Sequence, residues 1–345
     1  MTLCAPPRGR GRTRWARAVA LLAALLLLTA CGVNANPSLD GAAPAGAAPQ
    51  PGRSGAAAVP TRYDIAPLLD PKHKYFGAAL PNVPTSLSAL GPFTKAVGKQ
   101  PNLLEFYTSW GASFDAAGAR QIYQDGALPY MAWEPYTPSL ADIAKGDTDS
   151  YIRQVAAQVA ALNLPVAISF GHEMNGNWYA WGYQSNTAAD FVNAWRHIHD
   201  LFQEAGADNV IWVWSPNIIN PDPSIQLAPY YPGNSYVDWI GMVGYYTLTG
   251  AKTFPTLYGP TMDEVDRFAD KPFLISETSS QPGNRRFADV DNLFSGVETH
   301  RNVVGFVWFD IPKRADWRIE NTPVPLAEYR KRASNPIFGF DLRSP

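Results

Sequence analysis

The chain has 345 residues, of which 46% are hydrophobic and 17% are charged, and this length allows one large globular domain or two small ones. Residues 1–30 carry five Arg and no acidic residue, so leaving them out of the total of 28 basic and 30 acidic residues gives a net charge of −7. This sign excludes nucleic-acid binding as a leading function, because such binding depends on basic groups that meet phosphates.

The first 30 residues have the three parts of a secretory signal. An Arg-rich start is followed by an uncharged run over 18–30, which is shorter than the roughly 20 residues that a membrane-spanning helix needs. The run ends in Leu28-Thr29-Ala30-Cys31, which resembles the bacterial lipobox. We therefore expect 1–30 to be a lipoprotein signal peptide, with Cys31 lipidated. An ordinary signal peptide with an incidental Cys is the alternative.

Residues 31–60 are rich in Ala, Pro, Gly and Asn, a composition that predicts a disordered linker. Cys4 and Cys31 are the only cysteines, so none remains in 61–345 for a disulfide or a catalytic nucleophile. No other segment is long and apolar enough to be transmembrane. We expect an exported protein that is held at the extracellular face of the cell membrane through Cys31 alone.

From about residue 74, short apolar runs alternate with amphipathic stretches. The runs predict β-strands over 75–80, 103–108, 128–133, 166–170, 210–215, 239–244, 273–276 and 303–309. Apolar residues at helical spacing predict helices over 149–162 and 187–205, and Gly206 marks the end of the second. Apolar strands separated by helices indicate a parallel sheet that is covered on both faces.

Eight such repeats match a (β/α)8 TIM barrel better than an open sheet. A doubly wound sheet is the alternative, but the chain has no Gly-rich phosphate loop of either standard type. We therefore expect residues 61–345 to form a single (β/α)8 domain.

In such a barrel the active site lies at the C-terminal ends of the strands. The residues at or just after the predicted strand ends include Thr108, Ser109, Trp110, Trp133, Glu134, His172, Glu173, Asn175, Trp214, Asn217, Tyr245, Tyr246, Glu277, Thr278, Trp308 and Asp310. Carboxylates, tryptophans and amide or hydroxyl groups are thus expected on one rim, which is what a carbohydrate cleft requires.

Two glutamates stand out at these ends: Glu173 follows the fourth run and Glu277 the seventh. Glycoside cleavage needs one carboxylic acid to protonate the departing oxygen and one carboxylate to act at the anomeric carbon. The strand ends of a single barrel can bring the two together although they are far apart in sequence. A structural, salt-bridged role is the alternative for either glutamate alone.

Two other hydrolytic chemistries fit poorly. His172-Glu173 could begin a zinc motif of the form His-Glu-x-x-His, but the second His position is Gly176. A Ser-His-Asp hydrolase lacks its Gly-x-Ser-x-Gly turn. We expect no metal and no cofactor.

The segment from Gly171 to Gly182, Gly-His-Glu-Met-Asn-Gly-Asn-Trp-Tyr-Ala-Trp-Gly, resembles the acid/base segment of glycoside hydrolase family 26, best known for β-mannanases. The similarity spans about residues 70–335 and includes Trp133-Glu134-Pro135, residues 209–217, Gly244-Tyr245, Ile275-Ser276-Glu277, Val307-Trp308-Phe309 and Asp316-Trp317-Arg318. It implies a (β/α)8 barrel and a retaining double displacement without a metal.

The resemblance also implies roles for particular residues. Glu173 would be the general acid/base and Glu277 the nucleophile. Tyr245 would donate a hydrogen bond to the nucleophile, and His172 would shape the site beside Glu173.

Four further residues are expected to bind substrate. Trp178, Trp181 and Trp308 would offer apolar faces to sugar rings, with a place in the core as the alternative for each. The amide of Asn175 suits sugar hydroxyls or the orientation of a carboxylate. Glu134, in contrast, is expected to be structural.

One departure from the family's sequence pattern affects the prediction of the substrate. The family often has Arg four residues before the acid/base, where this chain has Ser169. The leading prediction is a monomeric, endo-acting enzyme on a β-linked polysaccharide, foremost β-1,4-mannan. A β-1,3 or mixed-linked β-glucan, a β-xylan or the cell's own exopolysaccharide are alternative substrates. A non-catalytic glycan-binding lipoprotein is an alternative of a different class.

Overall fold

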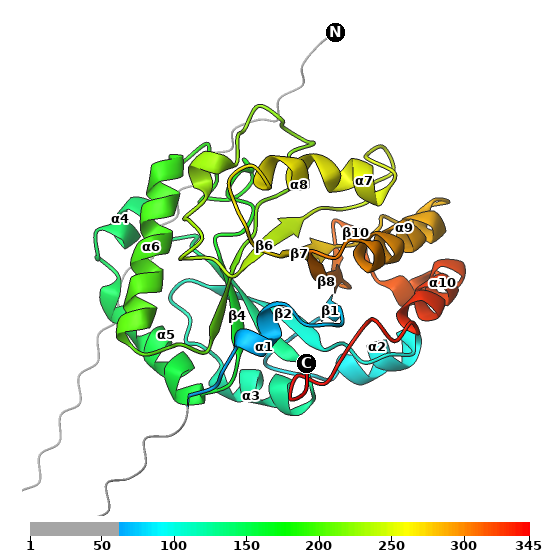
Figure 1. Cartoon of the computed structure of the whole chain (residues 1–345), viewed down its shortest axis with the longest axis horizontal. Coiled ribbons are helices and arrows are strands. Elements are labelled where there is room, and N and C mark those ends of the chain that lie inside the picture. The colour runs from blue at the N-terminus through cyan, green and yellow to red at the C-terminus, as the bar shows by residue number, and fades with distance from the viewer. Residues whose placement is uncertain (1–61) are drawn as a thin grey trace, which may run out of the picture. The chain divides into compact units, whose positions relative to one another are not determined.

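The computed structural model describes residues 62–345. The signal peptide predicted over 1–30, Cys31 and the linker predicted over 31–60 lie outside the described residues. Eight parallel strands close a barrel in which each strand pairs with the next along the chain and the last pairs with the first (Figure 1). They are β1 (Tyr75–Ala79), β2 (Leu103–Ser109), β3 (Leu128–Glu134), β4 (Val166–Phe170), β5 (Val210–Trp214), β6 (Trp239–Val243), β7 (Phe273–Thr278) and β8 (Val303–Phe309). The predicted (β/α)8 barrel is thus confirmed.

Helices surround the barrel, as Figure 1 shows. They are α1 (Ala66–Leu69), α2 (Leu90–Val97), α3 (Ala116–Gln124), α4 (Leu140–Ala144), α5 (Asp149–Leu162), α6 (Ala188–Glu204), α7 (Phe254–Leu257), α8 (Gly259–Val265), α9 (Arg286–Thr299) and α10 (Pro323–Ala333). Two short 3-10 helices, η1 (Ala228–Tyr230) and η2 (Ile319–Asn321), and a hairpin of β9 (Pro312–Lys313) and β10 (Ala315–Asp316) lie in the loops.

Local sequence explains why α6 begins where it does. The Thr187 hydroxyl accepts a hydrogen bond from the backbone N–H of Asp190, and the Asp190 carboxylate accepts one from the backbone N–H of Thr187. This reciprocal pair satisfies two N–H groups that the first helical turn leaves free. Phe191 and Trp195 then bury one face of the helix against the barrel.

The strands are apolar on both faces because each face meets a different core. In β8, Phe306 and Trp308 belong to the cluster between the barrel and the helices. Val307 and Phe309 belong to the cluster that fills the barrel itself. Successive side chains of a strand point to opposite faces, so both clusters are built from the same eight segments.

The barrel closes where β1 meets β8, from Tyr75 opposite Gly305 to Ala79 opposite Phe309. A Cβ atom at Gly305 would lie 2.4 Å from the backbone oxygen of Tyr75, so only glycine allows the two strands to approach this closely.

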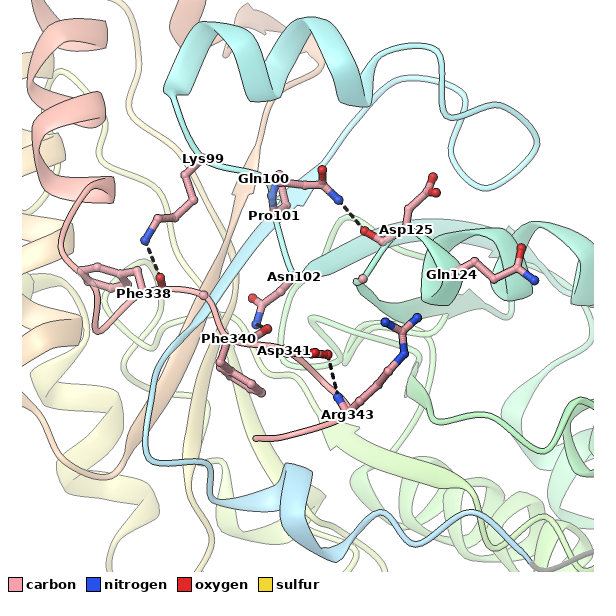
Figure 2. A pocket seen from close by; sticks show the side chains of 12 residues that line it. Lys99, Gln100, Pro101, Asn102, Gln124, Asp125, Phe338, Phe340, Asp341 and Arg343 are labelled. Carbon is pink, nitrogen blue, oxygen red and sulfur yellow. Dashed lines mark hydrogen bonds between the residues drawn. The ribbon is translucent and has the colours of Figure 1, made fainter.

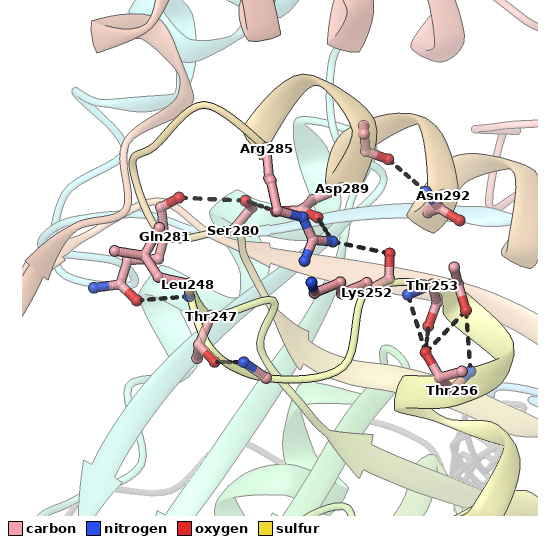
Figure 3. Close-up of polar contacts among 12 residues, drawn as sticks. Thr247, Leu248, Lys252, Thr253, Thr256, Ser280, Gln281, Arg285, Asp289 and Asn292 are labelled. Carbon is pink, nitrogen blue, oxygen red and sulfur yellow. Dashed lines mark hydrogen bonds and ion pairs between the residues drawn. The ribbon is translucent and has the colours of Figure 1, made fainter.

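The loops after β6 and β7 are tied to each other by polar contacts (Figure 3). The backbone N–H of Leu248 donates to Oε1 of Gln281 at 3.2 Å. The guanidinium of Arg285 donates to the backbone oxygen of Lys252 at 3.1 Å and to the Asp289 carboxylate at 2.9 Å. These contacts fix the segment after Tyr245 against the segment after Glu277.

Candidate active site

Glu173 and Glu277 lie on the same rim of the barrel, in the segments at the C-terminal ends of β4 and β7. Each is only 8% exposed. Tyr107, which donates a hydrogen bond to Glu277, packs edge-on against the ring of His172, the neighbour of Glu173. Burial raises the pKa of Glu173, and the negative charge of Glu277 adds to this rise. The structure therefore brings together the two residues that the sequence singled out.

Glu277 is held by two phenol groups from neighbouring strands. Tyr107, in β2, donates its hydroxyl proton to Oε2, and Tyr245, just after β6, donates to Oε1. Both oxygens of the carboxylate are thus fixed in place. Burial raises the pKa of Glu277, and the hydrogen bonds from the two tyrosines counter that effect because they stabilise the ionised form.

The backbone at Glu173 is unusual. Glu173 has a φ of 55°, in the left-handed region that non-glycine residues rarely occupy. Its N–H donates to the backbone oxygen of Ser215 at 2.7 Å, and its own carbonyl accepts from the N–H of Gly176 at 2.8 Å. Such conformations cost about 1–3 kcal/mol and concentrate at functional sites.

The carboxylate of Glu173 accepts two hydrogen bonds of a different kind. The indole N–H of Trp178 donates to Oε2 at 2.9 Å, and the side-chain amide of Asn217 donates to Oε1. Burial and the charge of Glu277 nevertheless raise the pKa of Glu173 to about 7. A carboxyl group with this pKa can both give and take a proton near neutral pH.

Asn175 orients Asn217. Its amide donates to the backbone oxygen of Asn217 at 2.8 Å, and its carbonyl oxygen accepts from the backbone N–H of Asn217 at 2.8 Å. This reciprocal pair uses one N–H and one acceptor position of the amide, so Asn175 supports the partner of Glu173. Contact of its remaining N–H with a sugar hydroxyl stays a prediction.

His172 is buried and neutral. Burial, with a smaller contribution from the charge of Lys313, lowers the pKa of His172 to about 3. Its Nε2 pairs with the hydroxyl of Tyr179 at 3.2 Å, and its ring packs edge-on against Trp181. It lies beside Glu173 and contributes shape and polarity without charge.

The three predicted sugar-stacking tryptophans have different positions. Trp178 is 45% exposed beside Glu173, where a sugar ring can reach it. Trp181 is 1% exposed and stacks on Tyr179, while its indole N–H donates to the backbone oxygen of His172 at 2.7 Å. Trp181 therefore holds the His172 loop and presents no free face to substrate.

The structure also corrects the prediction for Trp308. Its side chain is fully buried and packs edge-on against Tyr329 of α10, on the outer side of the barrel. Its indole N–H donates to Asp310 at 3.1 Å. The prediction that Trp308 contacts sugar is wrong, because the neighbouring residue Phe309, and not Trp308, faces inward toward Tyr245.

The sequence did not predict the contacts of several residues of the site. Tyr107 and Asn217 bond the two glutamates directly, and the ring of Trp317 lies 4.9 Å from that of Tyr245. Burial raises the pKa of both glutamates, and the charge of Lys313, exposed on the β9–β10 hairpin, offsets a small part of that rise. Tyr107 could have been found, since it lies at the C-terminal end of the strand predicted over 103–108.

Two cavities differ in size and in their distance from the carboxyl pair. One of about 200 Å³ lies next to Glu173 and is lined by Trp178, Tyr183, Asn217 and Asp222 among others. A larger one, of about 590 Å³, is formed by residues that precede β2 and β3 and by the C-terminal segment (Figure 2). It lies at the N-terminal ends of the strands, so it is remote from the carboxyl pair.

No cluster of three or more His, Cys, Asp or Glu side chains within 62–345 has the arrangement of a metal site. In the same part of the chain, no helix combines the length and apolarity that crossing a membrane requires.

The comparisons with known proteins agree with this geometry. The model of glycosyl hydrolase family 26 matches residues 140–258, which include Glu173 and its partners. Endoglucanase H of Acetivibrio thermocellus is 30% identical over 269 residues, which cover 73% of this chain and 30% of that protein. Together these matches support glycosyl hydrolase family 26.

Two further similarities are in line with family 26. The mannan endo-1,4-beta-mannosidase A and B of Caldalkalibacillus mannanilyticus is 29% identical over 150 residues, which cover 40% of this chain and 27% of that protein. The chain thus spans less than a third of either relative. The catalytic domain of the family 26 endo-beta-1,4-mannanase from Bacillus sp. JAMB-750 has the same fold, with a TM-score of 0.62, 17% identity and coverage of 79% of this chain and 88% of that one.

Proposed function

We propose that the chain is a retaining, endo-acting glycoside hydrolase of family 26, with Glu173 as general acid/base and Glu277 as nucleophile. The observation that carries the proposal is the difference between the two buried carboxyl groups on one rim. Glu277 accepts hydrogen bonds from two tyrosine hydroxyls, which favour its ionised form, whereas the charge of Glu277 favours the protonated form of Glu173.

In the first step, an oxygen of Glu277 attacks the anomeric carbon while the bond from that carbon to the departing oxygen breaks. Glu173 gives its proton to the departing oxygen, and a covalent glycosyl-enzyme remains. In the second step, Glu173 takes a proton from water, whose oxygen displaces Glu277 from the anomeric carbon. Two displacements restore the original β configuration.

The substrate that we propose first is a β-1,4-mannan, because two of the similar proteins are named as mannan-cleaving enzymes. A β-glucan is the second candidate. A relative that matches 73% of this chain is named an endoglucanase, and Ser169 stands where the resemblance leads one to expect Arg. Ser169 is buried in β4, inside the barrel, and offers no charge to a substrate.

We also propose that residues 1–30 direct export and that a lipid on Cys31 anchors the enzyme at the outer face of the cell membrane. Residues 31–60 would then act as a tether. This placement suits a substrate that is too large to enter the cell.

The test is release of reducing ends from purified galactomannan, glucomannan, mixed-linked β-glucan, β-1,3-glucan and β-xylan. We expect cleavage of at least one of them, and a loss of about 1,000-fold or more in kcat for Glu277→Ala. Glu204→Ala is the control, because that side chain is 58% exposed and, within residues 62–345, forms an ion pair only with Arg153 in α5. Full activity of Glu277→Ala would contradict the assignment, and oligosaccharide binding without any product would favour the non-catalytic alternative.

A further inference from the structure

The cavity of about 200 Å³ beside Glu173 lies on one side of the carboxyl pair. Trp178 and Asn217, which both donate hydrogen bonds to the carboxylate of Glu173, line this cavity. Neither of the two tyrosines that donate to Glu277 is among its lining residues. The cavity therefore adjoins the acid/base and not the nucleophile.

The size of the cavity suits a single sugar ring. A dry cavity of about 150 Å³ is large enough to hold a benzene molecule. A cavity of about 200 Å³ therefore has room for one pyranose ring, and Trp178, which is 45% exposed, offers that ring an apolar face. Because Glu173 gives its proton to the departing oxygen in the proposed reaction, the sugar in this cavity is the one that departs.

Asp222, in the loop after β5, is the one charged residue among the described residues that line the cavity. The backbone N–H and the hydroxyl of Ser224 both donate to its Oδ1 and fix the orientation of the carboxylate. The bond from the hydroxyl lowers the pKa of Asp222, so this group is ionised at neutral pH. No described Lys, Arg or His lines the cavity to balance its charge.

The second oxygen of Asp222 is open to a ligand. Among the described residues, Oδ2 accepts a hydrogen bond only from the hydroxyl of Tyr183, at 3.4 Å. Hydrogen bonds between oxygens are normally shorter, at roughly 2.5–3.0 Å, so this contact is weak. Oδ2 can therefore accept a hydroxyl of a sugar in the cavity. A carboxylate in the same place would be repelled, because two like charges would lie only a few ångströms apart.

We propose that Asp222 selects the departing sugar by charge: it binds the hydroxyls of a neutral sugar and excludes an acidic one, such as a uronic acid. The selection acts on one side of the cleaved bond, because the cavity holds only the sugar beyond the departing oxygen. An acidic polysaccharide is then cleaved only where a neutral sugar follows the bond. This inference rests on the proposed role of Glu173 as general acid.

The test uses glucomannan and mixed-linked β-glucan in which a small share of the primary hydroxyls is oxidised to carboxylates. The sugar that occupied the cavity becomes the new non-reducing end of one product, so mass spectrometry of the products identifies it. We expect uronic acid to be about 10-fold rarer at these ends than at the next sugar along. In Asp222→Asn the two positions should have nearly equal contents, whatever the overall rate of cleavage.

Two controls separate the charge of Asp222 from other effects. Glu204→Gln removes a negative charge from the exposed face of α6 and should leave the depletion of uronic acid unchanged. Conversion of the carboxylates to methyl esters removes their charge and keeps the carbon skeleton, so the wild-type enzyme should accept these sugars at both positions. Equal uronic acid contents in wild-type products, or a depletion that persists in Asp222→Asn, would overturn the proposal.

Binding to Glu277→Ala provides a second measurement, without turnover. The oxidised polymer should bind this variant less tightly than its methyl ester does, and adding Asp222→Asn should reduce that difference about 3-fold or more. An unchanged difference would show that Asp222 does not select by charge. Failure of the wild-type enzyme on every native polysaccharide would instead contradict the proposed function, and the binding comparison would still decide this inference.

Discussion

Glu173 and Glu277 differ in their hydrogen-bond donors. Glu277 lies between the hydroxyls of Tyr107 and Tyr245, while Glu173 accepts from the indole of Trp178 and the amide of Asn217. Both are buried, so donors and mutual repulsion decide which carboxyl ionises first. The charge of Glu277 raises the pKa of Glu173, which gives the pair one base and one acid near neutral pH.

Tyr245→Phe tests the hydrogen bond from the Tyr245 hydroxyl to Glu277. Loss of a hydrogen bond that stabilises the carboxylate raises the pKa of Glu277, so the acid limb of the kcat/KM profile should move to higher pH. We expect kcat/KM to fall about 10- to 100-fold at neutral pH. Tyr246→Phe is the control, because the neighbouring Tyr246 hydroxyl is buried without a hydrogen-bond partner. Equal losses of kcat/KM in the two variants would show that the hydrogen bond from Tyr245 to Glu277 has no special role.

Trp178→Phe tests the donor to Glu173. Because the indole N–H stabilises the ionised carboxylate, its loss raises the pKa of Glu173 above the present value of about 7. The alkaline limb of the pH profile should therefore move to higher pH. Glu277→Gln removes a negative charge and should lower the same pKa, which a carbon-13 NMR titration of the Glu side chains can follow. Shifts in the same direction for both variants would refute this electrostatic account.

For single residues, the sequence predicts where some side chains lie and fails for others. Glu277 follows an apolar run directly and Glu173 comes three residues after one, so their place on the rim could be read from the order of elements. Trp308 could not be placed, because Val303–Phe309 is apolar at every position and no polar residue marks the inward face. The contacts of Asn175 depend on Asn217, which comes from a different strand.

Among the elements, the strands were predicted best. All eight begin at the predicted residue, and α5 matches its predicted range over 149–162. Long apolar runs and apolar residues at helical spacing are the clearest signals of secondary structure in a sequence. The β9–β10 hairpin that carries Lys313 was not predicted, because two-residue strands leave no periodic pattern.

Gly305→Ala tests how the barrel closes. The added methyl group would meet the backbone of Tyr75 across the β1–β8 pair, so we expect the free energy of unfolding to fall by about 1–3 kcal/mol. Gly91→Ala, in α2, is the matched control: its Cβ meets no atom within 4 Å, and the change should be neutral or stabilising by up to about 1 kcal/mol. Urea unfolding measures both, and equal stability of the two variants would contradict the close approach.

For the molecule as a whole, the barrel has two distinct ends. The carboxyl pair and its aromatic neighbours gather at the C-terminal ends of the strands, while the cavity of Figure 2 lies at the other end. The order of strands and helices was enough to predict the end at which the carboxyl pair lies, because the C-terminal ends of parallel barrel strands share one face. It did not predict the cavity at the other end.

Cys31→Ser tests the proposed anchor. If a lipid on Cys31 holds the protein, this variant should move from the membrane fraction to the soluble fraction and take up no labelled fatty acid. Cys4→Ser, the same change at the other cysteine of the chain, should leave the protein in the membrane fraction. Identical fractionation of the two variants would argue for an ordinary signal peptide.

The central claim is a double displacement by Glu173 and Glu277, and the configuration of the first product tests it most directly. Proton NMR can follow the new reducing end during cleavage of a β-linked oligosaccharide, before the anomers interconvert. We predict that the β anomer appears first, because two displacements at the anomeric carbon retain its configuration. If the α anomer appears first, water attacks directly, and Glu277 is not the nucleophile.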